Sequence, residues 1–242
     1  MTAGASERNS IVTRYVDAFR SGDQEVVDEP GLRRRRLVVV LVTVVVGVVV
    51  NAWALRIPAG DPMFYVGTAV LALVWLTGAF ASGPIRLGRE PSRDGRRPLG
   101  SSVAVAAALA ALFCAGALVV ARIGPLREPV EALLAHASVE NLALVAVLTA
   151  VNGVAEECFH RGAVYSAAQR YHPIAVSTLV YAGVTAASGI PLLVLAAVLL
   201  GLVTAVQRRC TGGVLGPAIT HVTWSMVMLL ALGPILEAAG PA

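Results

Sequence analysis

Residues 33–55, RRRRLVVVLVTVVVGVVVNAWAL, place four arginines directly before a run of nineteen residues that contains no charge. A helix needs about 20 such residues to cross the hydrocarbon core of a bilayer. A cleavable signal peptide has a shorter apolar core and a small-residue cleavage site, so we interpret this run as a first transmembrane helix. Arginines at one end of a span hold that end in the cytoplasm, which predicts a cytoplasmic N-terminus.

The rest of the chain is also apolar. Of its 242 residues 57% are hydrophobic and 14% are charged, whereas a typical soluble domain has about 25% charged residues. After the first span, at 37–55, further spans are predicted at 63–83, 101–122, 138–158, 174–189, 191–207 and 213–236, of which 174–189 and 191–207 are rather short. We therefore predict an all-α, multi-pass transmembrane helical bundle of about seven spans, with an eighth helix if 126–136 lies at the membrane surface.

The positive charges indicate how these spans are oriented. Every basic residue is an arginine, and clusters beside apolar runs occur on alternate loops: Arg33–Arg36, then Arg86, Arg89, Arg93, Arg96 and Arg97, then Arg161 and Arg170, then Arg208 and Arg209. By the positive-inside rule these loops are cytoplasmic and the C-terminus is outside. The net charge of +4 is thus typical of a cell-membrane protein whose partner is the lipid bilayer, and it does not indicate nucleic-acid binding. A helical pattern at 10–19 fits a helix on the membrane surface or, equally, a loosely ordered tail.

The stretch AEECFHRG, at 155–162, concentrates ionisable groups where an apolar run ends. On a helix over about 138–165, Asn152, Glu156 and His160 would share one face, and Glu157 and Arg161 form a second i, i+4 pair. The helix could simply leave the membrane here, with its charges solvated. However, acidic groups near a helix C-terminus oppose the macrodipole, and the sequence continues apolar as GAVYSAA. Ionisable residues inside a membrane usually face an interior cavity and serve a function, which is the interpretation we favour.

A second polar residue lies within the last predicted span. His221, in GPAITHVTWS, has no charged neighbour in sequence. Taken alone it is more typical of a packing residue that hydrogen-bonds within a bundle. Facing a buried carboxylate across one cavity, however, a neutral imidazole could help to activate water. We therefore predict that Glu156 and His221 approach each other, with Glu157 and Arg161 paired at the edge of the cavity.

These two segments together resemble a known family, the CAAX-processing and bacteriocin-processing (CPBP) intramembrane proteases, which include the lysostaphin-resistance-protein-A-like proteins. EECFHR matches its EExxxR signature, and LLGLVTAVQRRCTGGVLGPAITHVTW, at 199–224, is similar to its later Gly-containing helix, Thr-Gly turn and His-bearing helix. The resemblance implies an intramembrane endopeptidase that cleaves a membrane-associated peptide or protein. It makes Glu156 the general base, Glu157 and Arg161 its supporting residues, and His221 a ligand of the water, a metal ion or the oxyanion.

The chain departs from the family pattern at two positions. The FxxxH motif aligns with YAGVT, which puts Tyr181 in place of Phe and Thr185 in place of His, and the HxxxN motif reads HVTWS, which puts Ser225 in place of Asn. A divalent metal such as Zn²⁺ is implied by the resemblance, but catalytic zinc typically has three protein ligands. Glu156 and His221 supply two, so the ligand set is incomplete unless Glu157 or His160 joins them.

His160 has two alternative roles. It could face the cavity one turn beyond Glu156 and do the work of the absent histidine. We favour the simpler alternative, in which it lies at the cytoplasmic membrane interface and titrates as a surface group, because a histidine is easily hydrated there.

The predicted organisation is a polar tail with an amphipathic helix (1–36), N-terminal spans (37–137), a protease core (138–236) and a short tail (237–242). Three functions remain open: a Glu-dependent endopeptidase, a catalytically degenerate relative that binds a membrane or peptide partner, and a small proton-coupled transporter. The last would require inverted repeats, and none is visible in the sequence.

Overall fold

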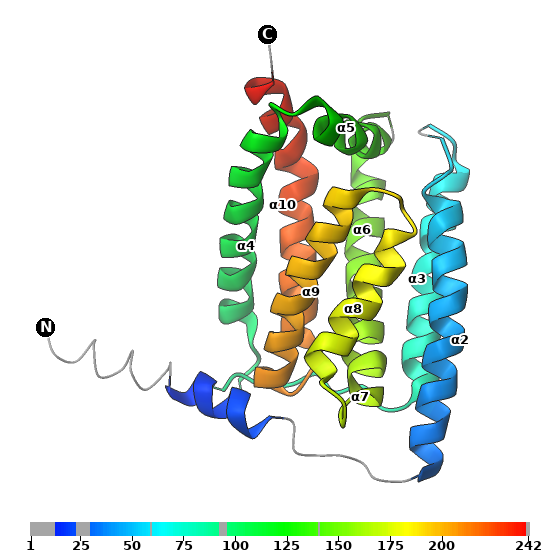
Figure 1. Ribbon diagram of the computed structural model, residues 1–242, viewed down its shortest axis with the longest axis vertical. Helices are drawn as coiled ribbons and strands as arrows, with labels where there is room; N and C mark the ends of the chain where they lie inside the picture. The colour runs from blue at the N-terminus through cyan, green and yellow to red at the C-terminus, as the bar shows by residue number, and fades with distance from the viewer. Residues whose placement is uncertain (1–12, 23–29, 59, 92–95, 140, 241–242) are drawn as a thin grey trace, which may run out of the picture.

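The computed structural model describes residues 13–22, 30–58, 60–91, 96–139 and 141–240, with the side chains of 136–139 excepted. Within these ranges the regular structure is entirely helical, which confirms the predicted fold class. The elements are α2 (Pro30–Ala54), α3 (Met63–Ser82), α4 (Leu99–Val120), α5 (Gly124–Val139), α6 (Leu142–Glu157), the π-helix η1 (Cys158–Val164), α7 (Tyr165–Ala167), α8 (Pro173–Ala186), α9 (Pro191–Thr211) and α10 (Leu215–Ala239). The long helices run side by side along the long axis, and α5 lies across one end (Figure 1).

Six of the described helices are long and apolar enough to cross a membrane: α2, α3, α4, α6 with its continuation through α7, α9 and α10. The remaining predicted span, at 174–189, is the shorter α8, which has 14 residues. At 1.5 Å per residue it is roughly 21 Å long, less than the ~30 Å hydrocarbon core. The chain therefore has the architecture of a multi-pass membrane protein. The helix predicted at 126–136 is present as α5, and its position at the membrane surface stays a prediction.

Several helix ends differ from the prediction. The first span begins at Pro30 and so includes the four arginines; the Nε of Arg35 donates to the carbonyl of Ala81, at the end of α3. The fourth span begins at Leu142, because the side chain of Asn141 accepts hydrogen bonds from the next helical N–H groups and caps the helix. The last helix continues through Ala239 into the predicted tail.

The arginine-rich loops lie together at one end of the bundle. The N–H of Val214 donates to Arg86 O (2.8 Å) and that of Arg89 to Thr211 O (2.8 Å), which joins the loop before α4 to the turn between α9 and α10. Gly213 allows this close approach, because a Cβ there would lie 2.0 Å from the backbone of Gly88. The C-terminal end of α10 lies at the opposite end of the molecule (Figure 1).

The N-terminal segment docks at the same end as these loops. Residues 13–21 are helical; the start of the predicted helix, at 10–12, lies outside the described residues. The hydroxyl of Tyr15 donates to Glu90, and the Nε of Arg209 donates to the carbonyl of Phe19 (2.6 Å). These contacts bring the N-terminal helix and the arginine loops to one end, as the topology predicts, while the side of the membrane on which they lie stays a prediction.

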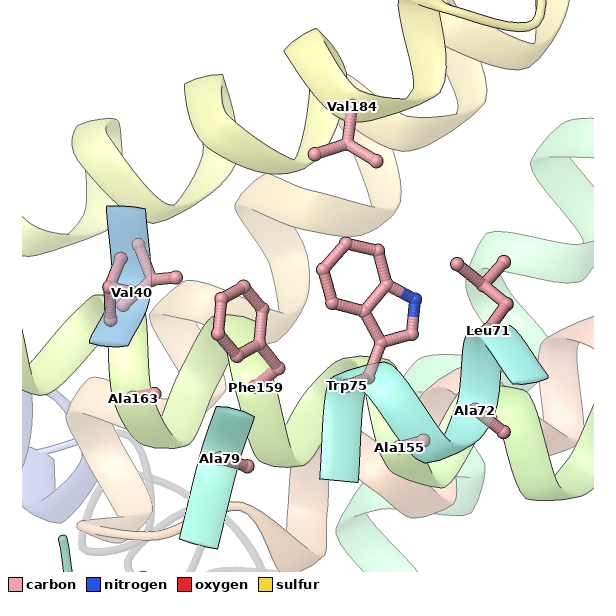
Figure 2. Packing of buried hydrophobic residues seen from close by; sticks show 10 residues of the cluster. Val40, Leu71, Ala72, Trp75, Ala79, Ala155, Phe159, Ala163 and Val184 are labelled. Carbon is pink, nitrogen blue, oxygen red and sulfur yellow. The ribbon is translucent and has the colours of Figure 1, made fainter. Parts of the chain in front are cut away.

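The largest apolar cluster joins α3 to the segment that carries the AEECFHRG motif. Trp75 and Phe159 stack with ring centroids 5.0 Å apart, and Val184 covers them from α8 (Figure 2). Gly47 of α2 also lies so close to the Trp75 ring that a Cβ would meet it at 2.0 Å. Because Phe159 belongs to the motif, this packing fixes the segment from which the charged side chains project.

Candidate active site

The charged motif lies inside the bundle and not at its surface. Residues 159–165 are all buried, and the side chains of Glu157 and Arg161 are 0% exposed. The alternative in which the helix leaves the membrane here with solvated charges is therefore wrong. The predicted continuous α-helix is also interrupted, because Cys158–Val164 form a π-helix. Such π-bulges are frequent at functional sites.

Glu157 and Arg161 form the predicted ion pair, in a more buried place than expected. Arg161 Nε lies 3.2 Å from Glu157 Oε2, and Arg161 Nη2 donates to the carbonyl of Gly201 on α9 (3.0 Å). A buried charge is tolerated only when it is paired and hydrogen-bonded. The pair is therefore fully buried, whereas the sequence predicts it at the edge of a cavity.

The ring of His221 lies between the carboxyl groups of Glu157 and Glu156. Its Nδ1 lies 2.9 Å from Glu157 Oε1, and its Nε2 lies 3.9 Å from Glu156 Oε2. The predicted approach of Glu156 and His221 is thus confirmed. The side chain of Glu156 is 21% exposed, whereas that of Glu157 is 0% exposed.

His160 does not lie at the membrane interface, so the alternative that we favoured for it is wrong. Its side chain is fully buried, and its ring lies 5.3 Å from that of Trp75 and 4.8 Å from that of Tyr181. Nδ1 is 2.9 Å from the carbonyl oxygen of Glu156. Because a carbonyl can only accept, Nδ1 carries the proton. The π-helix turns His160 into the aromatic packing between α3 and α8, away from solvent.

A comparison with known families finds a match over this part of the chain. Residues 138–227 match the family model described as type II CAAX prenyl endopeptidase Rce1-like. The chain carries an Rce1-like domain. The matched range includes every residue of the cluster, from Glu156 to His221. No curated protein and no solved structure matches the chain.

The Rce1-like domain does not fit a three-ligand metal site. Across the described ranges, no group of three His, Cys, Asp or Glu side chains is placed to hold a metal ion. The oxygens of Glu157 already face Arg161 and His221, and His160 is directed into the aromatic packing. Glu156 and His221 therefore remain two potential ligands, fewer than the three that catalytic zinc typically has.

Three residues of the Rce1-like domain differ from the family motifs: Tyr181, Thr185 and Ser225. Each makes different contacts. The Thr185 hydroxyl donates to the carbonyl of Tyr181 (2.9 Å), one turn back in α8, and is thus engaged within its own helix. Tyr181 is buried, and its hydroxyl lies within hydrogen-bonding reach of Glu156. Ser225 is half-buried one turn after His221, and the hydrogen bonds of the described cluster do not include it.

Asn152 acts in helix packing and not in the cluster. Its Nδ2 donates to Thr68 O on α3 (3.1 Å) and to Leu148 O one turn back (3.1 Å). Asn152 and Glu156 lie one turn apart on α6, as predicted. The side-chain amide of Asn152, however, is hydrogen-bonded to α3 and not to the charged residues.

Sequence reasoning missed the role of Arg208, which we had assigned to a cytoplasmic loop. Arg208 is buried within α9, its Nε donates to the carbonyl of Arg161 (3.0 Å), and its guanidinium lies 5.1 Å from the centre of the Tyr165 ring. A signal was available, because Leu200, Thr204 and Arg208 recur at i, i+4 and i+8 and all three are buried. Arg208 thus supports the backbone of the motif from a neighbouring helix.

Proposed function

We propose that the protein is an intramembrane endopeptidase in which Glu156 activates a water molecule for attack on a peptide bond. One observation carries this proposal: the accessible carboxylate of Glu156 lies 3.9 Å from His221 Nε2, while the other ring nitrogen is held by the buried Glu157. The match of residues 138–227 to the Rce1-like family model supports the same reaction class.

The buried ion pair determines which ring nitrogen is free. Glu157, held as a carboxylate by Arg161, accepts the Nδ1–H of His221. In the neutral imidazole, Nε2 is then the acceptor. Since 3.9 Å is too long for a direct hydrogen bond, a water placed beside both groups donates one hydrogen to Nε2 and the other to Glu156 Oε2.

The reaction then needs one proton carrier. Glu156 takes a proton from the water as the water oxygen bonds to the carbonyl carbon of the substrate, which gives a tetrahedral intermediate. Protonated Glu156 then gives this proton to the amide nitrogen as the carbon–nitrogen bond breaks. The products are a carboxylic acid and an amine, and the enzyme returns to its starting state. No step is assigned to a metal ion, because the residues present do not fit one.

The position of the cluster along α10 indicates where cleavage would occur. His221 lies six residues after Leu215, where α10 begins, or roughly 9 Å from that end at 1.5 Å per residue. This is the end that carries the arginine loops, which the positive-inside rule assigns to the cytoplasm. The substrate is thus a peptide or protein segment that enters the bilayer from its cytoplasmic side.

A second function is favoured by one observation. The Thr185 hydroxyl is engaged within α8, so it cannot replace the histidine of the motif. A domain without that group would bind a membrane peptide or protein partner without cleaving it. The test below separates these two functions.

The experiment compares the purified parent protein in detergent with Glu156→Gln on a library of quenched fluorescent peptides. Glu156→Gln keeps the shape of the side chain and removes the base, so cleavage should fall by roughly 10²–10⁴-fold. Glu131→Gln is the matched control, because Glu131 is an exposed carboxylate in α5, and its activity should equal that of the parent. Binding of peptides without cleavage by the parent would favour the second function, and cleavage that survives in Glu156→Gln would contradict the proposed mechanism.

A further inference from the structure

Hydrolysis at Glu156 requires a donor for the negative charge that forms on the carbonyl oxygen. The N–H groups of Arg161, His221 and His160 are already bonded or fully buried. Arg161 is fully buried behind Glu157 and donates to Gly201 O. The Nδ1–H of His221 is directed to Glu157, and the Nδ1–H of His160 to the carbonyl of Glu156.

The Tyr181 side chain brings an O–H group next to the cluster, and its ring lies 6.2 Å from that of His221. The hydroxyl lies within hydrogen-bonding reach of the Glu156 carboxyl, which is the group that faces His221 Nε2. It projects from α8, whereas Glu156 belongs to α6 and His221 to α10. A substrate carbonyl placed for attack by a water on Glu156 would therefore lie next to this hydroxyl.

The ring of Tyr181 is held in one orientation by its neighbours. It lies 4.8 Å from the His160 ring, and the guanidinium of Arg161 lies 5.0 Å from its centre. Gly201 closes the third side, because a Cβ there would lie 3.3 Å from Tyr181 Cδ1. Donors that are fixed before the reaction need no reorganisation when charge develops. These contacts also explain the position of His160, whose ring supports that of Tyr181.

We propose that Tyr181 is a catalytic residue whose hydroxyl donates a hydrogen bond to the oxyanion of the tetrahedral intermediate. This inference rests on the proposed endopeptidase function. As the water oxygen bonds to the carbonyl carbon, the π electrons move to the carbonyl oxygen, and the Tyr181 O–H turns from Glu156 to this oxygen without transferring its proton. The hydrogen bond is released when the carbonyl reforms and the carbon–nitrogen bond breaks.

The test is Tyr181→Phe, which keeps the ring and its contacts and removes the hydroxyl alone. Using the peptide that the parent cleaves best, we expect kcat to fall by roughly 10²–10³-fold, as for the loss of one oxyanion donor, with KM within about threefold of the parent because ground-state binding does not use this bond. Tyr171→Phe is the control, since Tyr171 is an exposed tyrosine outside the cluster, and its kcat should equal that of the parent.

A second measurement keeps the inference testable independently of turnover. A peptide phosphonate resembles the tetrahedral intermediate, so its affinity should fall in Tyr181→Phe by the same factor as kcat. A kcat within threefold of the parent, or unchanged affinity for the phosphonate, would overturn the role of Tyr181 and leave the function of Glu156 standing. Cleavage that survives in Glu156→Gln, or a parent that cleaves no peptide, would overturn the proposed function and this inference with it.

Discussion

Replacing Arg161 by Met should destabilise the protein far more than the same change at an exposed arginine. Arg161 makes a 3.2 Å ion pair with Glu157, both side chains are 0% exposed, and Arg161 also donates to Gly201 O. Removal of one partner from a buried pair leaves an uncompensated charge and costs about 3–5 kcal/mol. Arg161→Met should therefore lower the free energy of unfolding by that amount.

Arg127→Met is the matched control for this prediction. Arg127 and Glu131 form an ion pair with the same four-residue spacing, 2.6 Å apart, but their side chains are 22% and 43% exposed. Exposed pairs contribute about 0.2–1 kcal/mol, so Arg127→Met should have a correspondingly small effect. The unfolding free energy of each variant can be measured in mixed micelles by titration with a denaturing detergent, followed by tryptophan fluorescence.

A double variant tests whether the charge itself is responsible. Glu157→Gln combined with Arg161→Met leaves no buried charge in the pair, so its cost should be smaller than the sum of the two single changes, with a coupling of at least about 1 kcal/mol. Equal effects of Arg161→Met and Arg127→Met would refute the reasoning, as would strict additivity in the double variant.

Three further predictions concern packing, pH and topology. Gly47→Ala should lower thermal stability, because its Cβ would meet the Trp75 ring at 2.0 Å, whereas Gly116→Ala, with nothing within 4 Å, should not. Burial and a hydrogen bond to a carboxylate raise the pKa of Tyr15 from 10.0 to about 12, so docking of the N-terminal helix should be intact below pH 10 and be lost towards pH 12. Increased protease cleavage of that helix would report the loss, and Tyr15→Phe should remove this pH dependence. A cysteine at Gly240 should react with an impermeant reagent outside intact cells; reaction only after lysis would contradict the predicted topology.

The membrane fold was predictable because it depends on long apolar runs, which the sequence displays directly. The shortness of α8 was also visible, since the apolar run at 174–189 is itself short. Helix ends were less predictable. The fourth span begins at Leu142 because the Asn141 side chain caps it, a local hydrogen bond that hydropathy does not register.

The site was predictable in composition and less so in geometry. Spacing placed Glu157 with Arg161, and the two conspicuous polar residues Glu156 and His221 do lie together. The π-helix was not predictable, because it depends on how the bundle closes around the motif. It places His160 in the aromatic packing between α3 and α8 and not at the membrane interface, and the surface role that we favoured for it was therefore wrong.

Arg208 is a second residue whose position was not predicted from the sequence. An arginine near the end of an apolar run is typical of a cytoplasmic flank, yet this one is buried and binds the backbone of Arg161. Its partner is 47 residues away in the chain, so only the packing of α9 against η1 reveals the contact.

The central claim is that a water activated by Glu156 attacks the peptide bond directly. It is tested most directly by a single turnover of the best-cleaved peptide in ¹⁸O-labelled water, with mass spectrometry of the new carboxyl group. The mechanism predicts one ¹⁸O atom in the product of the first turnover from the parent, and no product from Glu156→Gln on the same time scale. First-turnover product without label, or labelled product from Glu156→Gln at the parental rate, would contradict it.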